Sequence, residues 1–548
     1  MKKTVVKRFL AVVSVLSLMI SVFAVADIPA NADAIMSSIS VQWANPQKLK
    51  SIDKQKTQAV LSANINKKTA KIYISFPKEG GIRLRTDTVN GYFEPKSLKN
   101  ITYYDLGYGV MLLKTDTAGV KINYLADPWS IEYLDGNEKT VHKITRRQMF
   151  FGYKDGQLRK VKLEGSLSEN EVIYGLGERY NGMNQVGSTV KLWNFDTAYH
   201  VASSSVKKVL SYANVPLLHS NKGYSLFFNS FYGAVADIGE RKTDRYSLDF
   251  NGTDFDFFVY ADTPSANIEA YTNLTGKPAT APKWAFRYWA GGNSVVWTEK
   301  GDDKTADVLN DILKKYNELG TVPSAVYAEG ITNKDSTYTT AKKYGVRVLT
   351  WNTPAATLTT GADLVSLRAL LPEITNDFDL PAQRTLDGTA LAAYWMDFSN
   401  PNAVTAYKRG GYDKYISQGL SGAMVDYGEY IDEGLSQYNG MKGDEMHNFY
   451  PNVYTKSIRE VFTSNKTNDF VLFARAACAG SQRFGGLFAG DQSATFDGLR
   501  QVVYGGLNVA ASGFSNWGSD IGSLSGTPSN QLYMRWLQFG AFSPFMRI

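Results

Sequence analysis

The hydrophobic pattern of the chain changes once, at a proline-flanked segment with the sequence PATAPKW at residues 278–284. Before this segment, apolar and polar residues alternate with the two-residue period of half-buried β-strands. After it, short apolar runs alternate with stretches that have the spacing of amphipathic helices. The two patterns require different folds, so the sequence predicts two domains that meet near residue 278.

The first domain, residues 35–277, is predicted to be an antiparallel β-sandwich. Strand-like runs occur at 70–76, 120–124 and 224–229, and turns containing Gly, Asn or Asp separate such runs. Aromatic residues make up 13% of the 548-residue chain, which suits either large sandwich cores or sugar-stacking surfaces. We interpret this domain as a scaffold that walls a neighbouring pocket, with polysaccharide binding as the alternative.

The second domain, residues 278–548, is predicted to be a (β/α)8 TIM barrel of the α/β class. Candidate strands lie at 285–289, 325–328, 346–351, 423–425, 470–474, 486–488 and 509–513. Helical patterns lie between them, as expected for parallel strands joined by crossovers. The segment 355–395 is long for a connecting loop and is predicted to be a loop insertion over the pocket.

The C-terminal end of the sequence bears on the last strand of this barrel. An eighth strand would begin near Phe542, but the sequence stops at Ile548 within an apolar run, without a cap or polar tail. We therefore expect a truncated sequence, with the barrel incomplete at its eighth strand. A barrel without its last strand would expose two strand edges and fold poorly.

The N-terminus has the features of a signal peptide, residues 1–34. Four basic residues precede an apolar stretch from Phe9 to Val25, and ADA at 32–34 offers a small-x-small cleavage site. The apolar stretch is short for a membrane anchor, and no other stretch is long enough to cross a bilayer. We therefore expect a secreted, extracellular protein without a membrane span in its mature chain.

Charge, cysteine and histidine usage exclude several functional classes. The net charge is +7, and +5 without residues 1–34, with basic and acidic residues interspersed, so nucleic acid is not an expected partner. Cys478 stands alone in a small, apolar setting and is predicted to be a buried, inert thiol. Four scattered histidines lack metal-ligand spacing, so no metal and no cofactor are expected.

Two aspartates carry the functional hypothesis. Asp426 and Asp491 each follow a short apolar run and begin a glycine-containing turn. The C-terminal ends of the strands are where an α/β barrel builds its active site. Two carboxyl groups that face one pocket could split a glycosidic bond, one as nucleophile and one as proton donor. Taken alone, the same pattern also fits two acids that only cap strand ends.

Several sequence blocks, in order, resemble glycoside hydrolase family 31, the α-glucosidase and α-xylosidase family. The similarity covers roughly residues 170–548. The matching blocks are YGLGER at 174–179, MDFSNP at 396–401, GAMVDYGE at 422–429, HNFYP at 447–451, Arg475 with GSQR at 480–483, GD at 490–491, DIG at 520–522 and RWLQFGAF at 535–542. A single block of this kind would be a weak signal, whereas the ordered set is specific.

The resemblance implies a retaining α-glycosidase that binds an oligosaccharide or glycoside. It makes Asp426 the nucleophile and Asp491 the general acid/base, and it implies that Arg475 holds Asp426 ionised or binds a sugar hydroxyl. Burial and the neighbouring negative charge should raise the pKa of Asp491. The other implied substrate-binding residues are Glu329, Met424, Phe488, Asp520 and Arg547. For Met424 and Phe488 the alternative is core filling, and for the charged residues it is a surface salt bridge.

Departures from the family pattern leave the sugar open. DYGE at 426–429 replaces the usual "DMNE" and resembles the "DFGE" of sulfoquinovosidases, whereas Glu329 stands where the family usually has an aspartate and would repel a sulfonate. The family's usual histidine in the eighth strand is missing before Ile548. The alternatives are an α-glucosyl transglycosylase, a sulfoquinovosidase-like enzyme and, in another class, a non-catalytic carbohydrate-binding protein.

Overall fold

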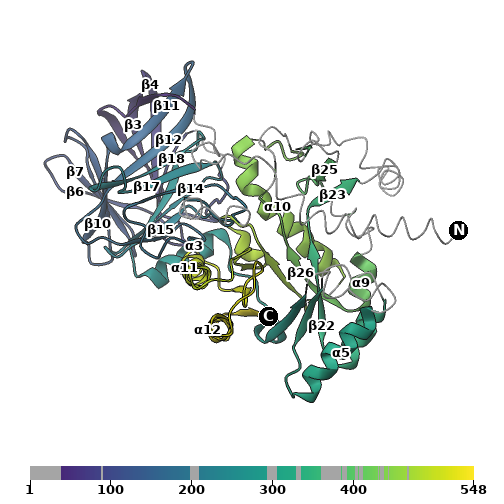
Figure 1. Ribbon diagram of the computed structural model, residues 1–548. Coiled ribbons are helices and arrows are strands. Elements are labelled where there is room, and N and C mark those ends of the chain that lie inside the picture. The colour runs from purple at the N-terminus through teal and green to yellow at the C-terminus, as the bar shows by residue number, and fades with distance from the viewer. Residues whose placement is uncertain are drawn as a thin grey trace.

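The computed structural model joins a β-rich N-terminal part to an α/β barrel, seen in Figure 1 as the purple-to-blue and the teal-to-yellow halves. The fold class predicted from the periodicity is therefore confirmed. The structure describes residues 39–87, 91–197, 209–292, 305–328, 335–358, 384–385, 392–401, 405, 412–429, 431, 437–441, 443–465 and 468–548.

Three antiparallel sheets build the N-terminal part. The largest has the order β13 (Ile173–Gly175), β15 (Leu217–Ser220), β16 (Tyr224–Phe228), β19 (Asp256–Tyr260), β5 (Ile82–Thr86), β4 (Lys68–Ser75), β3 (Gln58–Ile65), β2 (Leu49–Lys54). The second has the order β1 (Gln42–Ala44), β11 (Met149–Lys154), β12 (Gln157–Ser166), β18 (Arg245–Phe250), β17 (Ala234–Ile238), β14 (Ser188–Leu192). The third has the order β10 (Thr140–Thr145), β9 (Ser130–Leu134), β8 (Gly119–Asn123), β7 (Val110–Lys114), β6 (Thr102–Asp105).

The two-residue alternation explains how these sheets bury one face. In β4, Ile72 and Ile74 are fully buried, whereas Lys71 is exposed and Tyr73 is half-buried. The inward residues of all three sheets join one apolar cluster that includes Trp129 and Phe257. Apolar burial of this kind contributes about 25 cal/mol per Å2 of surface removed from water, which makes it the main force that holds the sandwich together.

Eight parallel strands close the barrel. In order they are β20 (Tyr288–Gly292), β21 (Ala325–Ala328), β22 (Arg347–Asn352), β26 (Leu420–Val425), β27 (Val471–Ala474), β28 (Gly486–Phe488), β29 (Trp517–Asp520) and β30 (Phe545–Arg547). The interior is filled by large side chains such as Trp289, Phe473 and Phe545. The interior of the barrel is therefore packed with side chains, and polar functional groups are expected at the ends of its strands.

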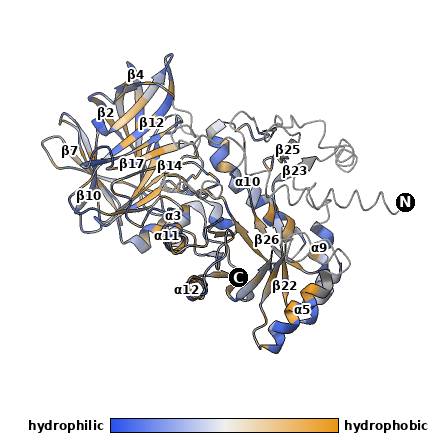
Figure 2. Cartoon of the chain, viewed as in Figure 1, coloured by the Kyte–Doolittle hydropathy of each residue, from blue (hydrophilic) through white to orange (hydrophobic). Residues whose placement is uncertain are grey.

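Helices lie between and around the barrel strands. Their bounds are α3 (Pro264–Thr275), α5 (Thr305–Glu318), α6 (Asp335–Lys343), α9 (Asp413–Gln418), α10 (Gly443–Ser464), α11 (Phe496–Ala511) and α12 (Asn530–Gly540). Figure 2 shows α5 with hydrophobic and hydrophilic stretches side by side, and its Leu309 and Leu313 are fully buried. Among the described residues, no helix combines the length and hydropathy needed to span a bilayer.

Two predicted strands need correction. The run at 509–513 is the C-terminal end of α11 and the turn after it, and the seventh strand is β29 instead. The first strand begins at Tyr288, because Lys283–Phe286 forms a 3-10 helix. Apolar periodicity alone does not separate a buried helix end from a short buried strand, which accounts for both errors.

The eighth strand was expected to be cut short, and the structure corrects this. β30 pairs with β29 on one side and with β20 on the other, so both neighbouring edges are occupied. Beyond it, the Ile548 backbone N–H donates to the Trp289 carbonyl oxygen at 2.9 Å. The predicted open edges are therefore absent from the described barrel.

Part of the predicted insertion at 355–395 falls outside the described residues. The part that the structure describes forms a three-stranded antiparallel sheet, made by β23 (Ala355–Leu358), β25 (Ala392–Trp395) and β24 (Arg384–Thr385). These strands pair with one another and are separate from the barrel sheet.

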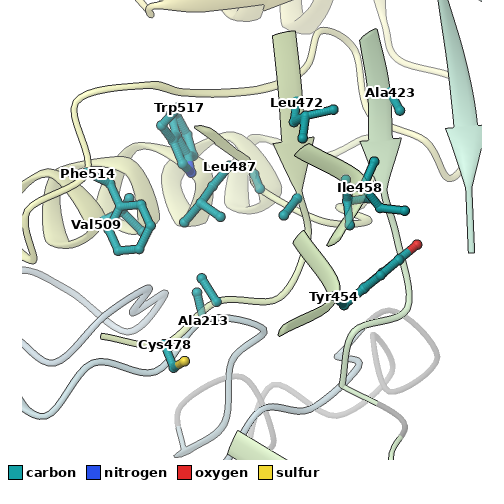
Figure 3. Packing of buried hydrophobic residues seen from close by; sticks show 14 of the residues in the cluster. Ala213, Ala423, Tyr454, Ile458, Leu472, Cys478, Leu487, Val509, Phe514 and Trp517 are labelled. Carbon is teal, nitrogen blue, oxygen red and sulfur yellow. The ribbon is translucent and has the colours of Figure 1, made fainter. Parts of the chain in front are cut away.

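The sandwich and the barrel share a continuous buried interface. One apolar cluster contains sandwich residues such as Ala213 and Phe227 together with barrel residues such as Leu472 and Cys478. Figure 3 shows Ala213 beside Cys478. Burial raises the pKa of the Cys478 thiol to about 12, as expected for the inert thiol predicted from its apolar neighbours.

Gly177 offers a test of the packing between the 174–180 and 213–215 segments, which form the sandwich side of this interface. Its φ of +84° disfavours L side chains, and an added Cβ would lie 2.3 Å from the Ala213 carbonyl oxygen. Gly187 has a similar φ of +86° but open space around its Cβ position. We expect Gly177→Ala to destabilise the protein by roughly 3 kcal/mol and Gly187→Ala by about 1 kcal/mol, because only the first adds a steric clash to the backbone strain.

Thermal unfolding of both variants measures this difference. Equal midpoints for the two variants would contradict the close packing of the 174–180 segment against the 213–215 segment.

Candidate active site

The functional side chains gather at the C-terminal ends of the barrel strands. Asp426 follows β26, Arg475 follows β27, and Asp491 lies three residues after β28. Asp520 and Arg547 are the last residues of β29 and β30. Because the strands are parallel, their C-terminal ends face the same side of the barrel, where pocket residues are expected.

Arg475 is the centre of this group, because its guanidinium contacts four carboxylates. Its Nε lies 3.0 Å from Asp426 Oδ1, and its Nη1 lies 3.4 Å from Asp491 Oδ2. Its Nη2 lies 3.2 Å from Asp196 Oδ2 and also pairs with Glu429. Burial alone would lower the pKa of Arg475, but the surrounding carboxylates raise it well above its ordinary value. The guanidinium therefore stays charged.

Asp426 is held by one ion pair and two hydrogen-bond donors. Besides Arg475 Nε, the Trp351 indole Nε1–H donates to Asp426 Oδ2 at 2.8 Å, and the Tyr427 backbone N–H donates to Oδ1 at 2.9 Å. The Asp426 backbone N–H in turn donates to the Asn352 carbonyl oxygen on the neighbouring strand. Both carboxylate oxygens are thus fixed in orientation, as a nucleophile requires.

Asp491 is less firmly held than Asp426, and its carboxyl group is protonated more easily than that of an ordinary aspartate. Its side chain is 17% exposed, and Arg475 is its ion-pair partner at 3.4 Å. Burial, followed by the negative charges of Asp196, Asp426 and Asp520, raises the pKa of Asp491 to about 7, although Arg475 opposes the shift. A carboxyl group that keeps its proton up to neutral pH can serve as a general acid.

Glu429 is the most buried acid of the group, with 1% of its side chain exposed. Burial raises the pKa of Glu429 to about 8. Arg475 opposes this shift, and the negative charges of Asp196 and Asp426 add to it. Within the described residues, Asp196, Asp426, Glu429 and Asp491 surround Arg475 and form no group with the arrangement of a metal site.

Tyr427 turns the chain sharply after Asp426. Its φ of +59° lies in the left-handed region, which is uncommon for an aromatic residue and is often found at functional sites. Its ring lies 4.3 Å from the Arg475 guanidinium and meets the Trp351 ring edge-on at 5.9 Å. Tyr427 thus covers one face of Arg475 beside the Asp426 carboxylate.

The other predicted site residues that the structure describes form a second group, around Arg547. Arg547 pairs with Asp520 and lies over the rings of Tyr327 and Phe488, at 4.7 and 5.4 Å. Met424 Sδ accepts a hydrogen bond from the Tyr327 hydroxyl at 3.2 Å. Met424 and Phe488 belong to the apolar interior cluster, which fits the core-filling alternative. Their role in sugar binding, like that of Asp520 and Arg547, stays a prediction, and Glu329 lies outside the described residues.

Several members of the site were missed from the sequence. Trp351 and Glu429 lie within or next to predicted strands, and a search for polar groups at strand ends could have found them. Asp196 and Tyr212 belong to the sandwich, and their hydroxyl–carboxylate contact at 3.0 Å completes the group around Arg475. No local pattern in the sequence indicates that these two residues reach the barrel.

Comparison with protein families assigns both parts of the chain. The family model "Glycosyl hydrolases family 31 TIM-barrel domain" matches residues 278–548, and the model "Glycosyl hydrolase 31 N-terminal galactose mutarotase-like domain" matches residues 71–237. The chain belongs to glycoside hydrolase family 31. The resemblance inferred from the ordered blocks is therefore confirmed, and with it the assignment to a family of glycoside-cleaving enzymes.

Curated relatives of this family 31 chain differ in activity. An alpha-xylosidase from Emericella nidulans is 27% identical over 414 residues, which cover 70% of this chain and 50% of the relative. An isomaltosyltransferase from Sporosarcina globispora is 25% identical over 560 residues, covering 92% and 50%. A sulfoquinovosidase from Escherichia coli is 34% identical over 161 residues, covering 28% and 24%. The chain spans about half the length of the first two relatives.

A solved structure supports the fold. The cycloalternan-forming enzyme from Listeria monocytogenes, in complex with a pentasaccharide substrate, matches with a TM-score of 0.80 at 20% identity, covering 93% of this chain and 52% of that chain. Identity at this level shows a shared fold and leaves the activity of this family 31 member open.

The Arg475 cluster predicts a pH-dependent stability. We expect Arg475→Met to destabilise the protein by about 3–5 kcal/mol, because buried carboxylates lose their counter-charge. The loss should be larger at pH 8 than at pH 5.5, because Asp491 and Glu429, with pKa values raised to about 7 and 8, are protonated at the lower pH.

Thermal unfolding at both pH values measures the effect. Arg179→Met is a matched control, because Arg179 is also buried but bonds to the Leu176 carbonyl oxygen and to Asn214. An Arg475→Met loss that is the same at both pH values would contradict the charge-balancing role.

Proposed function

We propose that this chain is a retaining α-glycosidase that hydrolyses α-glucosides or related oligosaccharides by double displacement. The observation that carries the proposal is the pairing of Asp426 and Asp491 on one guanidinium, with different surroundings for the two carboxyl groups. Asp426 accepts hydrogen bonds from Trp351 and Tyr427 and pairs with Arg475, whereas Asp491 is partly exposed and has a pKa raised to about 7.

The first step forms a glycosyl–enzyme ester. The Asp426 carboxylate attacks the anomeric carbon, the glycosidic C–O bond breaks, and Asp491 gives its proton to the departing oxygen. Asp426 loses its negative charge as Asp491 gains one. Both face Arg475, so the total charge around the guanidinium is the same before and after the step.

The second step releases the sugar. The Asp491 carboxylate removes a proton from water, the water oxygen attacks the anomeric carbon, and the bond to Asp426 breaks. Asp491 then carries its proton again, and two inversions give net retention of the α configuration.

The substrate class is supported by the relatives. The alpha-xylosidase and an Alpha-glucosidase 2 from Bacillus thermoamyloliquefaciens both align over at least 70% of this chain. The sulfoquinovosidase similarity is confined to 28% of the chain. The DYGE sequence at 426–429 is a separate resemblance to enzymes of that type. Sulfoquinovosidase-like activity therefore remains the narrower alternative within the family.

Transglycosylation is the second candidate, because the isomaltosyltransferase aligns over 92% of this chain. The chemistry needs no further residue, since a sugar hydroxyl replaces water in the second step. Product analysis at high substrate concentration separates the two activities. Free monosaccharide alone would exclude the transferase, and oligosaccharides longer than the substrate would support it.

The first activity test uses a panel of aryl α-glycosides, namely the glucoside, xyloside, galactoside and sulfoquinovoside. We expect turnover of at least one, and a loss of about 10^4-fold or more in kcat for Asp426→Ala, because the variant lacks the carboxylate that forms the ester.

Asp491→Ala should also lose activity, but azide should restore turnover of an activated substrate as a glycosyl azide, because the small anion enters the space left by the acid. Saccharide binding without any turnover of the panel would instead favour a carbohydrate-binding protein.

The raised pKa of Asp491 predicts where kcat/KM begins to fall on the alkaline side of the pH profile, here called the alkaline limb. Only the protonated acid can assist the leaving group, and its fraction falls as the pH rises through about 7. We expect kcat/KM for an alkyl α-glycoside to decline above that pH. A dinitrophenyl glycoside, whose leaving group needs no proton, should show a much weaker decline, and equal declines would contradict the assignment of Asp491 as the acid.

Export is part of the proposal and rests on the signal-peptide features of residues 1–34. Expression in a secreting host, followed by N-terminal sequencing of the extracellular protein, should give Ile35 as the first residue. Retention of the uncleaved chain in cells would contradict export.

A further inference from the structure

We propose that Asp196, which the β-sandwich carries, is a positioning residue for the reaction: it orients Arg475 and contributes the charge that keeps Asp491 protonated. The inference rests on the proposed glycosidase function and extends it to a residue outside the barrel.

Asp196 contacts the guanidinium at Nη2, the nitrogen beside the Nε that faces Asp426. It is the fourth residue after β14, and its Oδ2 lies 3.2 Å from Arg475 Nη2. Its Oδ1 accepts a hydrogen bond from the Tyr212 hydroxyl at 3.0 Å, and the Tyr212 ring lies 5.0 Å from the same guanidinium. Only 2% of the Asp196 side chain is exposed, so Asp196 acts through Arg475 and has no surface for a sugar.

Contacts on the preceding residues fix Asp196 against the barrel. The Trp193 ring stacks on His447 of α10 with 3.6 Å between centroids. The Asn194 backbone N–H donates to Asn448 Oδ1 at 3.1 Å, and Asn448 Nδ2 donates to the Leu192 carbonyl oxygen at 2.9 Å. The position of Asp196 is therefore set by how the sandwich docks on α10.

The shape of the guanidinium transmits this position to the reacting groups. It is planar and rigid, so the two carboxylates at Nη2, those of Asp196 and Glu429, together determine where Nε and Nη1 point. Those two nitrogens contact Asp426 and Asp491. A shift of the Asp196 anchor would thus change the placement of both carboxyl groups together.

The charge of Asp196 has a second effect. After burial, the neighbouring negative charges of Asp196, Asp426 and Asp520 raise the pKa of Asp491, and Arg475 opposes them. Tyr212 also packs against this region, since its ring lies where a Cβ on Gly490 would fall. Removing the Asp196 charge therefore leaves Asp491 more easily deprotonated.

Asp196→Asn tests the proposal, because it removes the charge while keeping the shape and the hydrogen-bonding capacity of the side chain. We expect kcat to fall about tenfold with less than a twofold change in KM. We expect the alkaline limb of kcat/KM for an alkyl α-glycoside to move to lower pH by roughly 0.5 to 1.5 units. Asp196→Glu, which keeps the charge, should leave the limb near its wild-type position.

Two controls separate charge from packing. Tyr212→Phe removes the hydroxyl that bonds Asp196 but keeps every carboxylate, so the limb should stay in place. Asp256→Asn removes another fully buried sandwich carboxylate, which pairs with Arg83 at 2.7 Å, and should lower the thermal midpoint without moving the limb.

The outcomes are distinct. An active wild-type protein whose alkaline limb is the same in Asp196→Asn overturns the role of Asp196, even if the variant is less stable. A limb that moves equally in Asp256→Asn overturns it too, because a general loss of stability would then suffice. A wild-type protein without turnover of any glycoside refutes the proposed function and, with it, this inference.

Discussion

The ion cluster around Arg475 is the interaction on which the rest of the site depends. One guanidinium contacts Asp196, Asp426, Glu429 and Asp491, and these carboxylates come from three different parts of the chain. Without that cation, burial of so many acids would be prohibitive. With it, the same burial becomes useful, because it distinguishes a carboxylate fixed by two hydrogen bonds and an ion pair from a carboxyl group that keeps its proton near neutral pH.

Much of the fold could be predicted from periodicity. The change of pattern near residue 278 indicated the β-sandwich and the barrel, and six of the seven candidate barrel strands overlap observed strands. The run at 509–513 failed because the buried end of α11 is as apolar as a strand, whereas the true strand β29 has the sequence WGSD, with few large apolar residues. Strands this short carry too little pattern to be recognised alone.

The site was predictable only where it is local in sequence. Asp426, Arg475 and Asp491 each follow a barrel strand, so a motif and a strand end coincide. Asp196 and Tyr212 contribute through contacts that cross about half the chain length, and no periodicity encodes such a pairing. For Phe488 and Met424, a family position suggested a role in sugar binding that stays a prediction, and the structure places both in the apolar interior cluster.

The sandwich segments that touch the barrel also bear on recombination between family 31 relatives. The 192–197 and 213–215 segments bond to α10 and to the Ala477 backbone, so the reaction centre is composite. A chimera cut at the linker near residue 278 would separate Arg475 from the acid that orients it. A recombination boundary that preserves activity must instead keep those two sandwich segments with the parental barrel, which makes the inherited functional unit larger than the barrel domain.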